Sequence, residues 1–376
     1  MLREVTDPRI QHSLHLSPPA PLQKLLRSRS KERNREGVSS EYESPPFGLV
    51  IFGASQLIKV GMDHMRRIVV NAPASSANLG SGFDVFAIGL RDPRDSIELR
   101  ASESQERIIS LNYTNGYAFL NSDITAAGAV VKAVAKEFEI KSKIDVTVNN
   151  RIPIGVGLGS SAASSVGVAV AMNRFFDLGL TEERLLSYAV EGEFAASGAR
   201  HYDNIAGSLQ GGFRIVHQDP LKTVGFPPPN GMAIVVVTPG IKLPVRKTEY
   251  ARSLLPKNLE LGNLTKNISL ASRVVAGFAK GDVAMIGSGL GDVVIEPARK
   301  AMIPWFDEVK SSALEAGAAG VFISGAGPSL TAVVDSLLSE PRRVRKAMTE
   351  CFAKHGILTK SFVTTVGGGA RIATEQ

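Results

Sequence analysis

The stretch Pro153-Ile-Gly-Val-Gly-Leu-Gly-Ser-Ser-Ala-Ala-Ser-Ser165 lies between a predicted strand and a predicted helix in this chain of 376 residues. Its three alternating glycines allow backbone N–H groups to turn toward one point, because glycine readily adopts a positive φ. The helix that is predicted to begin near Ser160 directs its unpaired N–H groups and the positive end of its dipole to the same point. The stretch therefore predicts an anion site built from main-chain donors.

Two standard nucleotide motifs do not describe this stretch. No lysine follows Gly159, as a P-loop requires, and the third glycine comes one residue too early for the dinucleotide fingerprint. What remains is a phosphate cradle with two hydroxyls, Ser160 and Ser161, at the start of the helix. A serine in that place can ligate Mg²⁺, as the Ser/Thr of P-loops does. A glycine-rich turn with a serine cap is the alternative interpretation.

The composition allows a sizeable core and excludes several classes of protein. The chain is 44% hydrophobic and 21% charged, which suits two folded domains. The single thiol, Cys351, excludes a disulfide framework and a Cys-based zinc site, and the histidines, His355 among them, form no metal-binding pattern. The apolar run of residues 47–61 is shorter than the ~20 residues of a spanning helix, so no transmembrane segment is evident.

The charge suits an acidic ligand but does not by itself identify it. The 43 Lys and Arg residues outnumber the 36 Asp and Glu residues, which gives a formal net charge of +7. This balance would suit a nucleic acid, a membrane surface or a phosphorylated small molecule. With 6% aromatic residues and no basic block interleaved with Tyr or Phe, the stacking surface of single-strand binders is hard to find. A nucleic acid is therefore not expected as a partner.

From Arg66 onward, hydrophobic periodicity predicts strands and helices. The expected strands, mostly antiparallel, include 68–70, which ends at Pro73, 96–102 and 144–150. The expected helices include 126–138, 160–176 and one that Thr181 caps. The three glycines of residues 366–372 are interpreted as close backbone packing rather than as a phosphate site. The mixture of elements predicts an α+β chain.

Composition also predicts how the chain is divided. The prolines of residues 226–231 precede a new series of strands and helices, so domains are expected at 66–230 and 231–376. Residues 1–64 are rich in proline and charge and are expected to be a disordered leader, or one that results from a start site assigned too far upstream.

Three further stretches carry candidate chemistry. They are residues 71–86, NAPASSANLGSGFDVF; residues 201–204, HYDN; and residues 323–330, ISGAGPSL. Together with the phosphate stretch, they resemble the ordered motifs of the GHMP kinases, and within these the motifs of the homoserine kinases. The resemblance runs from about Arg66 to the end of the chain. It implies a two-domain GHMP kinase fold: a domain like ribosomal protein S5 domain 2, followed by a ferredoxin-like domain.

The resemblance also implies an activity. It is the ATP-dependent phosphorylation of the side-chain hydroxyl of L-homoserine to O-phospho-L-homoserine, in threonine biosynthesis, with ATP and Mg²⁺. A homodimer in the cytoplasm is expected, with a plastid as the lesser alternative and with neither nucleic acid nor membrane as a partner. A GHMP kinase for shikimate or mevalonate is the alternative enzyme. A kinase-like binding protein is the non-enzyme alternative, although it would need broken motifs, and Ser161, Glu193 and Asn204 are present.

Residue by residue, the resemblance assigns the triphosphate and the metal as follows. Mg²⁺ is expected to bind Ser161 and Glu193. The nearby Glu191 is set aside, because two positions along a helix turn by about 200°. The phosphates fall to the loop Pro153, Ile154, Gly155, Val156, Gly157, Leu158, Gly159, Ser160, Ser161, Ala162 and Ala163.

The resemblance assigns five residues to the amino acid and one to its hydroxyl. The amino acid is expected to bind Asn78, Asp84, His201, Arg252 and Arg299. Asp84 would meet the ammonium, and the two arginines would meet the α-carboxylate, since a guanidinium offers a planar fork that matches it. Asn204 is expected to position the acceptor hydroxyl. Asn cannot take a proton, so the phosphate itself is expected to do so.

Overall fold

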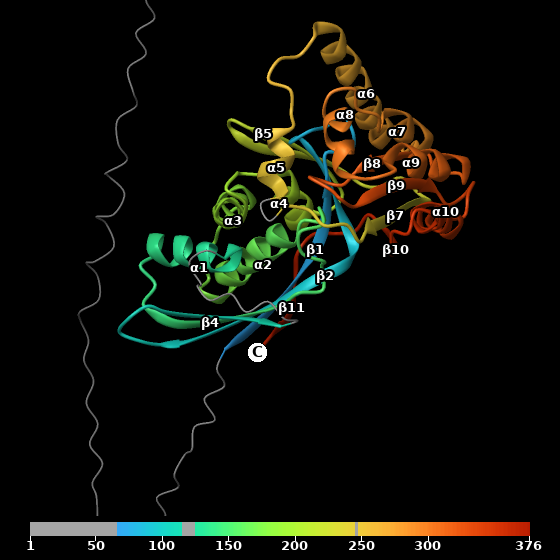
Figure 1. Cartoon of the computed structure of the whole chain (residues 1–376). Helices are drawn as coiled ribbons and strands as arrows, with labels where there is room; N and C mark the ends of the chain where they lie inside the picture. The colour runs from blue at the N-terminus through green and yellow to red at the C-terminus, as the bar shows by residue number, and fades with distance from the viewer. Residues whose placement is uncertain (1–65, 115–124, 245–246) are drawn as a thin grey trace, which may run out of the picture. The chain divides into compact units, whose positions relative to one another are not determined.

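The structure, a computed structural model, describes residues 66–114, 125–244 and 247–376. The leader predicted at 1–64 lies outside the described residues. Within them, strands and helices form two sheets with their covering helices (Figure 1).

The first sheet has seven strands. A path of five runs in the order β11-β1-β2-β4-β3, while β5 pairs with β2 and with β6. Only β3 and β4 are parallel among these pairs, which confirms the expectation of mostly antiparallel strands. The bounds are β1 Arg67–Ala77, β2 Phe86–Glu103, β3 Ile108–Thr114, β4 Ser142–Asn149, β5 Phe213–Gln218, β6 Leu221–Phe226 and β11 Arg371–Glu375.

Four helices cover one face of this sheet. Along β1, Ile68, Val70 and Ala72 are fully buried and alternate with half-buried residues, so one face of the strand packs inward. The second and fourth helices pack directly on β1 and β2, and the first and third pack against the second. Figure 1 shows them in green beside the strands. Their bounds are α1 Ala126–Glu137, α2 Ser160–Phe175, α3 Glu182–Ser197 and α4 Tyr202–Gln210.

The second sheet has the connectivity that the resemblance implied. Its strands are β7 Met232–Pro239, β8 Gly320–Ile323, β9 Leu330–Asp335 and β10 Thr359–Thr365, which lie in the order β10-β7-β9-β8. Numbered in chain order, this is 4-1-3-2, the order of a ferredoxin-like sheet. The accompanying helices are α5 Lys247–Ser253, α6 Leu261–Lys280, α7 Val283–Gly289, α8 Ile295–Arg299, the 3₁₀ turn η2 Lys300–Met302, α9 Phe306–Glu315 and α10 Pro341–Lys354.

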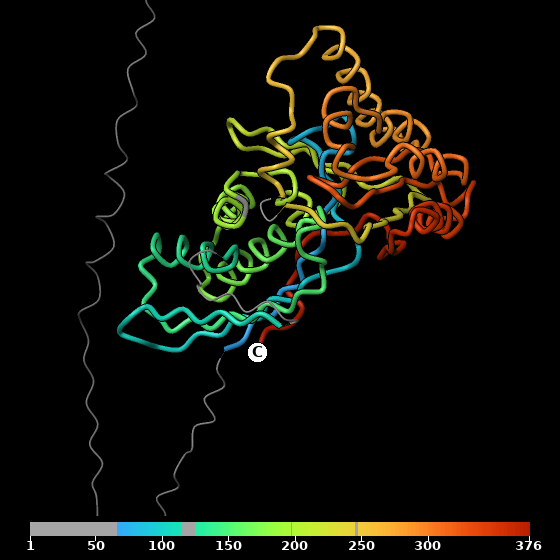
Figure 2. Tube along the Cα trace, viewed as in Figure 1, coloured from blue at the N-terminus to red at the C-terminus, as the bar shows by residue number. Residues whose placement is uncertain are grey.

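The end of the chain returns to the first sheet. After β10 the chain passes through three consecutive glycines, and β11 then pairs antiparallel with β1 (Figure 2). A Cβ on Gly367 would lie 2.5 Å from the Cα of Arg91, and one on Gly369 would lie 2.0 Å from the carbonyl oxygen of Leu209. These distances confirm close backbone packing at Gly367 and Gly369, whereas a Cβ on Gly368 would meet nothing within 4 Å. Because β11 belongs to the first sheet but follows the second sheet in the chain, two consecutive domains would separate it from the strand with which it pairs.

The structure corrects the expected end of the first strand. Pro73 does not end β1, which continues to Ala77 after a shift of register between Pro73 and Ser75. Proline cannot donate to the ladder, and a register shift is a place where a strand tolerates it.

Among the described residues, no helix is long and apolar enough to cross a membrane.

Candidate active site

The phosphate loop has the backbone that its glycines predict. Gly155, Gly157 and Gly159 have φ values of 74°, 89° and 66°, in the left-handed region that favours glycine. Gly159 is the N-cap of α2, and as a glycine it has no side chain that could cap the N–H groups of that helix. The loop therefore presents open main-chain donors together with a helix N-terminus, the combination that binds phosphate.

Segments from two distant parts of the chain hold this loop. Ser75 N on β1 donates to the carbonyl of Leu158 at 3.2 Å, and Ser324 Oγ donates to the carbonyl of Gly157 at 2.6 Å. A Cβ on Gly157 would lie 2.2 Å from the Ser324 carbonyl oxygen, and one on Gly159 would lie 2.2 Å from Ser75 Oγ. The 71–86 and 323–330 motifs thus meet at the phosphate loop, and two of its glycines are required by close approach as well as by φ.

The predicted metal ligands lie together. Ser161 Oγ donates to Glu193 Oε2 at 2.6 Å, and Glu193 is buried. Glu191, which was set aside from the sequence, is half-exposed and pairs instead with Arg200 at 3.2 Å. A hydroxyl and a carboxylate at a helix N-terminus form a set of hard oxygen donors that fits a small divalent cation such as Mg²⁺.

Asn204 lies beside the phosphate loop. Its Oδ1 accepts a hydrogen bond from Ser75 Oγ at 2.9 Å and lies 3.1 Å from where a Cβ on Gly159 would be. Within the described part of the chain its Nδ2 has no hydrogen-bond partner, so this amide can serve a ligand. His201 is the N-cap that precedes α4, three residues before Asn204. The His201 ring lies with Nδ1 3.1 Å from Glu193 Oε1.

The loop of the 71–86 motif has unusual backbone angles. Asn78, Leu79 and Asp84 have φ values of 77°, 42° and 58°, which non-glycine residues rarely adopt and which cluster at functional sites. Asn78 Nδ2 donates to the carbonyl of Gly325 at 2.9 Å, and Asn78 Oδ1 accepts from Asp84 N at 3.1 Å. Asn78 therefore supports the loop that presents Asp84.

The two arginines that are predicted to bind the α-carboxylate of the substrate both lie beside that loop. Arg252 Nη2 donates to Asp84 Oδ2 at 2.8 Å, and Arg252 and Arg299 lie 5.6 and 4.9 Å from the ring centre of Phe83. Arg299 is buried, and its Nη1 donates to the carbonyl of Gly325 at 2.9 Å. Its buried Nε has no partner among the described residues. A buried cationic donor without a partner is costly, and an anionic ligand would relieve that cost.

Burial and neighbouring charges shift several pKa values here. Burial raises the pKa of Asp203 to about 6, and the charge of Asp84 adds to the effect. Burial would lower the pKa of His201, but the hydrogen bond and charge of Glu193 outweigh it and raise the pKa overall. Burial lowers the pKa of Arg299. Perturbed groups gathered in one place mark a candidate functional site.

Comparisons with known proteins identify the family. Residues 125–212 match the GHMP kinases N terminal domain, and residues 274–354 match the GHMP kinases C terminal. The chain is 37% identical over 310 residues to a homoserine kinase of Methanocella arvoryzae, covering 82% of this chain and 98% of that one. The chain belongs to the GHMP kinase family. Members of this family use ATP.

Two further relatives agree. The homoserine kinase of Pyrococcus furiosus is 38% identical over 304 residues, covering 80% of this GHMP kinase and 99% of that chain. The crystal structure of homoserine kinase from Cytophaga hutchinsonii superposes with a TM-score of 0.76 at 31% identity, covering 86% of this chain and all of that one (100%). The fold expected from the sequence is thereby confirmed.

Sequence analysis missed one cation of the site. Lys247, at the start of α5, donates from Nζ to the carbonyl of Gly327. Burial and the charge of Arg299 lower the pKa of Lys247 to about 8, against the opposing charge of Glu193. No motif marks this lysine, and its only signal is its place five residues before Arg252.

The structure also corrects the expectation about cysteine and histidine. One ligand atom from each of Glu308, Cys351 and His355 lies within 4.8 Å of the others, so these residues could together hold a metal ion. Cys351 and His355 are four residues apart on one side of the end of α10, and Glu308 comes from α9. A single thiol therefore does not exclude a mixed metal site, and His355 does not stand apart. The group includes none of the predicted site residues.

A buried carboxylate fixes the entry to the phosphate loop of this GHMP kinase. Asp95 Oδ1 accepts hydrogen bonds from the backbone N–H groups of Arg151 and Ile152 at 2.7 and 2.9 Å, and Oδ2 accepts from Asn150 Nδ2 at 3.0 Å. Burial raises the pKa of Asp95 to about 6, although these hydrogen bonds act to lower it. Asp95 thus holds the three residues that precede Pro153.

We expect Asp95 to make stability depend on pH. The folded state has a pKa of about 6 at Asp95 against the ordinary 3.8, so it binds more protons between these values. The resulting stability is present below pH 3.8 and is lost as the pH rises through about 6, for a total of about 3 kcal/mol. Asp95→Asn should remove this fall. Urea unfolding at several pH values between 4 and 7.5 measures it.

Asp145→Asn, on the neighbouring strand β4, is the control and should keep the wild-type profile. If the free energies of unfolding of wild type and Asp95→Asn change in parallel with pH, the raised pKa of Asp95 is wrong.

Proposed function

We propose that this protein transfers the γ-phosphoryl group of ATP to the side-chain hydroxyl of L-homoserine, which gives O-phospho-L-homoserine for threonine biosynthesis. Relatives named homoserine kinase, at 37% and 38% identity over most of this chain, support the acceptor. The observation that carries the choice is the meeting of one carboxylate and two guanidinium groups, Asp84, Arg252 and Arg299, around Phe83.

This arrangement complements a free amino acid. The ion pair between Arg252 and Asp84 joins the two charges that a zwitterion would separate. An incoming ammonium would take Asp84, and an incoming carboxylate would take Arg252 together with the unpartnered Nε of Arg299. Only about 10 Å³ of cavity remains between Asn78, Arg299 and Gly325, about the room that one water needs. Binding would therefore exchange the internal pair for two pairs with the ligand.

The triphosphate would lie on the open N–H groups of residues 153–163, where the N-terminus of α2 adds its partial positive charge. Lys247, whose pKa is affected by the charges of Arg299 and Glu193, would contribute a further positive charge. Phosphoryl transfer needs alignment and charge compensation more than covalent chemistry. Main-chain donors and cations of this kind supply both.

Ser161 and Glu193 would hold Mg²⁺, since their oxygens form a hard donor pair at the helix N-terminus. When bound, the ion compensates the charge of the β- and γ-phosphates. The His201 ring orients the second oxygen of Glu193, at 3.1 Å from Nδ1. This contact keeps the carboxylate turned toward Ser161.

Asn204 would position the acceptor hydroxyl. Ser75 Oγ holds its Oδ1, so the Nδ2 of the amide is left to bind a ligand oxygen. Asp203 is the nearest carboxylate in the sequence, but it is buried and accepts a hydrogen bond from Asn204 N at 2.7 Å. We therefore propose no dedicated base, and the transferred phosphate takes the proton of the hydroxyl.

Acceptor choice tests this function directly. The full chain is incubated with ATP and Mg²⁺ and with homoserine, shikimate or mevalonate separately, and ADP release is measured. We expect kcat/KM for homoserine to exceed the other two by at least about 10⁴-fold, because the site leaves buried polar groups unpaired with ligands that lack the ammonium. Chelation of the metal should abolish turnover.

Turnover with shikimate or mevalonate alone would overturn the acceptor but keep the kinase. No ADP release with any acceptor would favour the kinase-like binding protein. The expected homodimer, the cytoplasmic location and the absence of nucleic-acid or membrane partners stay predictions.

A further inference from the structure

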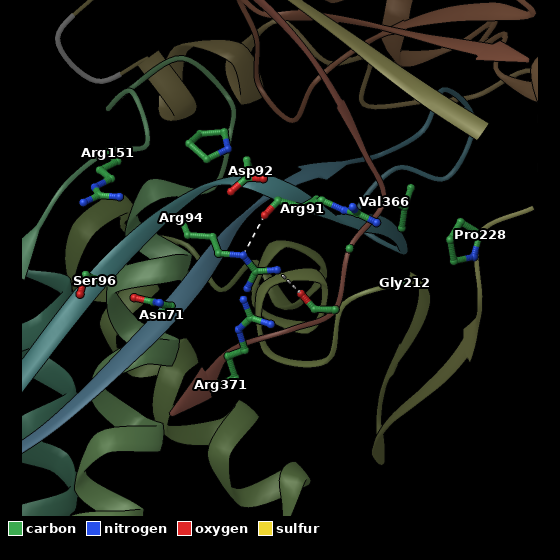
Figure 3. A pocket seen from close by; sticks show the side chains of 13 residues that line it. Asn71, Arg91, Asp92, Arg94, Ser96, Arg151, Gly212, Pro228, Val366 and Arg371 are labelled. Carbon is green, nitrogen blue, oxygen red and sulfur yellow. Dashed lines mark hydrogen bonds between the residues drawn. The ribbon is translucent and has the colours of Figure 1, made fainter. Parts of the chain in front are cut away.

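A second charged cavity lies apart from the phosphate loop. It has a volume of about 960 Å³. Among the described residues, its lining includes Arg91, Arg94, Arg151 and Arg371 but a single acidic residue, Asp92 (Figure 3). None of the residues in this lining belongs to the predicted active site. The volume lies within the range of small-molecule sites, which is roughly 300–1,000 Å³.

Strand pairing assembles this cavity from distant parts of the chain. Asn71 on β1 lies opposite Ser96 on β2 and opposite Arg371 on β11. These three polar residues therefore form a row across three strands. The neighbours of Asn71 in the strand, Val70 and Ala72, are fully buried, so the row lies on the face opposite the helices.

One arginine of the cavity is held in place by backbone carbonyls. Arg94 Nε donates to Arg91 O at 2.8 Å, while Nη1 and Nη2 donate to the carbonyls of Gly369 and Gly368 at 3.2 and 3.0 Å. Figure 3 shows its guanidinium group next to that of Arg371. Three of its five N–H donors are thus used for positioning, and its charge and remaining donors are left for a ligand.

The arginines of the cavity are not paired with carboxylates among the described residues. None of its four arginines makes an ion pair in the part of the chain that the structure describes. Burial lowers the pKa of Arg94, and the charges of Arg371 and Arg91 lower it further, against the opposing charge of Asp92. A bound anion would remove this repulsion.

The backbone of Arg151 is also held in place by a hydrogen bond. Its backbone N–H is one of the groups that the buried Asp95 binds, and Asp95 directly follows Arg94 in β2. The two sides of the cavity that carry Arg94 and Arg151 are therefore joined by one buried carboxylate. Such pre-organisation reduces the conformational entropy that the backbone of the site loses when a ligand binds.

We propose that Arg91, Arg94, Arg151 and Arg371 form a binding site for a phosphorylated aliphatic small molecule, separate from the site on the phosphate loop. Guanidinium forks match phosphate oxygens, and a phosphate concentrates about two negative charges in one group. No aromatic side chain of the described residues lines the cavity, so they offer a purine or pyrimidine base nothing to stack on. The site therefore favours an aliphatic phosphate over a nucleotide.

Calorimetry with glycerol 3-phosphate tests the proposal on the full chain. The titration is made in the presence of saturating Mg²⁺ and a non-hydrolysable ATP analogue and is repeated without them. We expect one binding site in both cases, with an affinity that falls as salt rises. Arg371→Gln should weaken binding about tenfold, and the double variant Arg91→Gln/Arg371→Gln should abolish it, because each substitution removes a charge-assisted donor.

The matched control is Arg67→Gln, on the same face of β1 but paired with Glu98 at 2.7 Å and outside the cavity. It should leave the affinity unchanged. The site is refuted by a wild-type chain that shows no binding, by a double variant that still binds, or by a control that weakens binding equally. Equal affinity for glycerol and glycerol 3-phosphate would also refute it. The readout is binding, so these results are independent of the acceptor assay.

Discussion

Replacing Glu193 by Gln is expected to lower kcat by about 10²- to 10³-fold, with KM for homoserine nearly unchanged. The substitution keeps the size of the side chain but removes the negative charge beside Ser161, to which Ser161 Oγ now donates at 2.6 Å. Removal of a charged group that acts on the transferring phosphates lowers kcat by about this factor. Steady-state kinetics at several Mg²⁺ concentrations measure the effect, and the Mg²⁺ requirement should rise.

Glu191→Gln is the matched control. Glu191 lies two residues earlier on α3, where it is half-exposed and paired with Arg200. Its kcat and Mg²⁺ dependence should remain those of the wild type. Full activity in Glu193→Gln, or equal losses in both variants, would remove Glu193 from the metal site.

Arg299→Lys is expected to raise KM for homoserine by about 100-fold and to leave KM for ATP unchanged. Lysine keeps the charge but not the fork, so it cannot both bind the Gly325 carbonyl and meet a carboxylate in a bidentate way. Weakening a buried, hydrogen-bonded charge contact costs about 3 kcal/mol, which corresponds to this factor. Initial rates with each substrate varied separately give both constants.

Lys300→Gln tests whether the effect is specific. Lys300 follows Arg299 directly but is half-exposed and pairs with Asp307 at 2.8 Å. This variant should keep both KM values. Circular dichroism establishes whether Arg299→Lys is folded. An unchanged KM for homoserine in a folded Arg299→Lys would show that Arg299 does not meet the substrate.

Much of the fold could be predicted because its signals are local. Period-two patterns marked β2 and β4, and Thr181 caps α3 as expected, with Thr181 Oγ1 accepting from Arg184 N at 3.4 Å. The boundary of β1 was missed, because proline usually ends a strand, whereas here a register shift accommodates it. The return of β11 to the first sheet has no local signal at all.

The candidate site could likewise be predicted only in part. The residue types at Ser161, Glu193, Asn204 and Arg299 could be assigned from motifs, and the structure brings these motifs together. The ion pair of Arg252 with Asp84 and the approach of Lys247 could not be predicted. Each depends on how α5 packs against the 71–86 and 323–330 motifs, which lie far from it in the chain.

The amino-acid sequence alone determined the phosphate loop. Alternating glycines allow the left-handed angles of residues 155–159 whatever surrounds them, since the constraint is the absence of a Cβ. Tertiary structure alone decided which charged groups lack a partner among the described residues: the Nε of Arg299 in the candidate site lacks a hydrogen-bond partner, and each of the four arginines of the second cavity lacks an ion-pair partner. Whether a charge finds a partner depends on residues that only long-range packing brings within a few ångströms, and no local pattern records that distance.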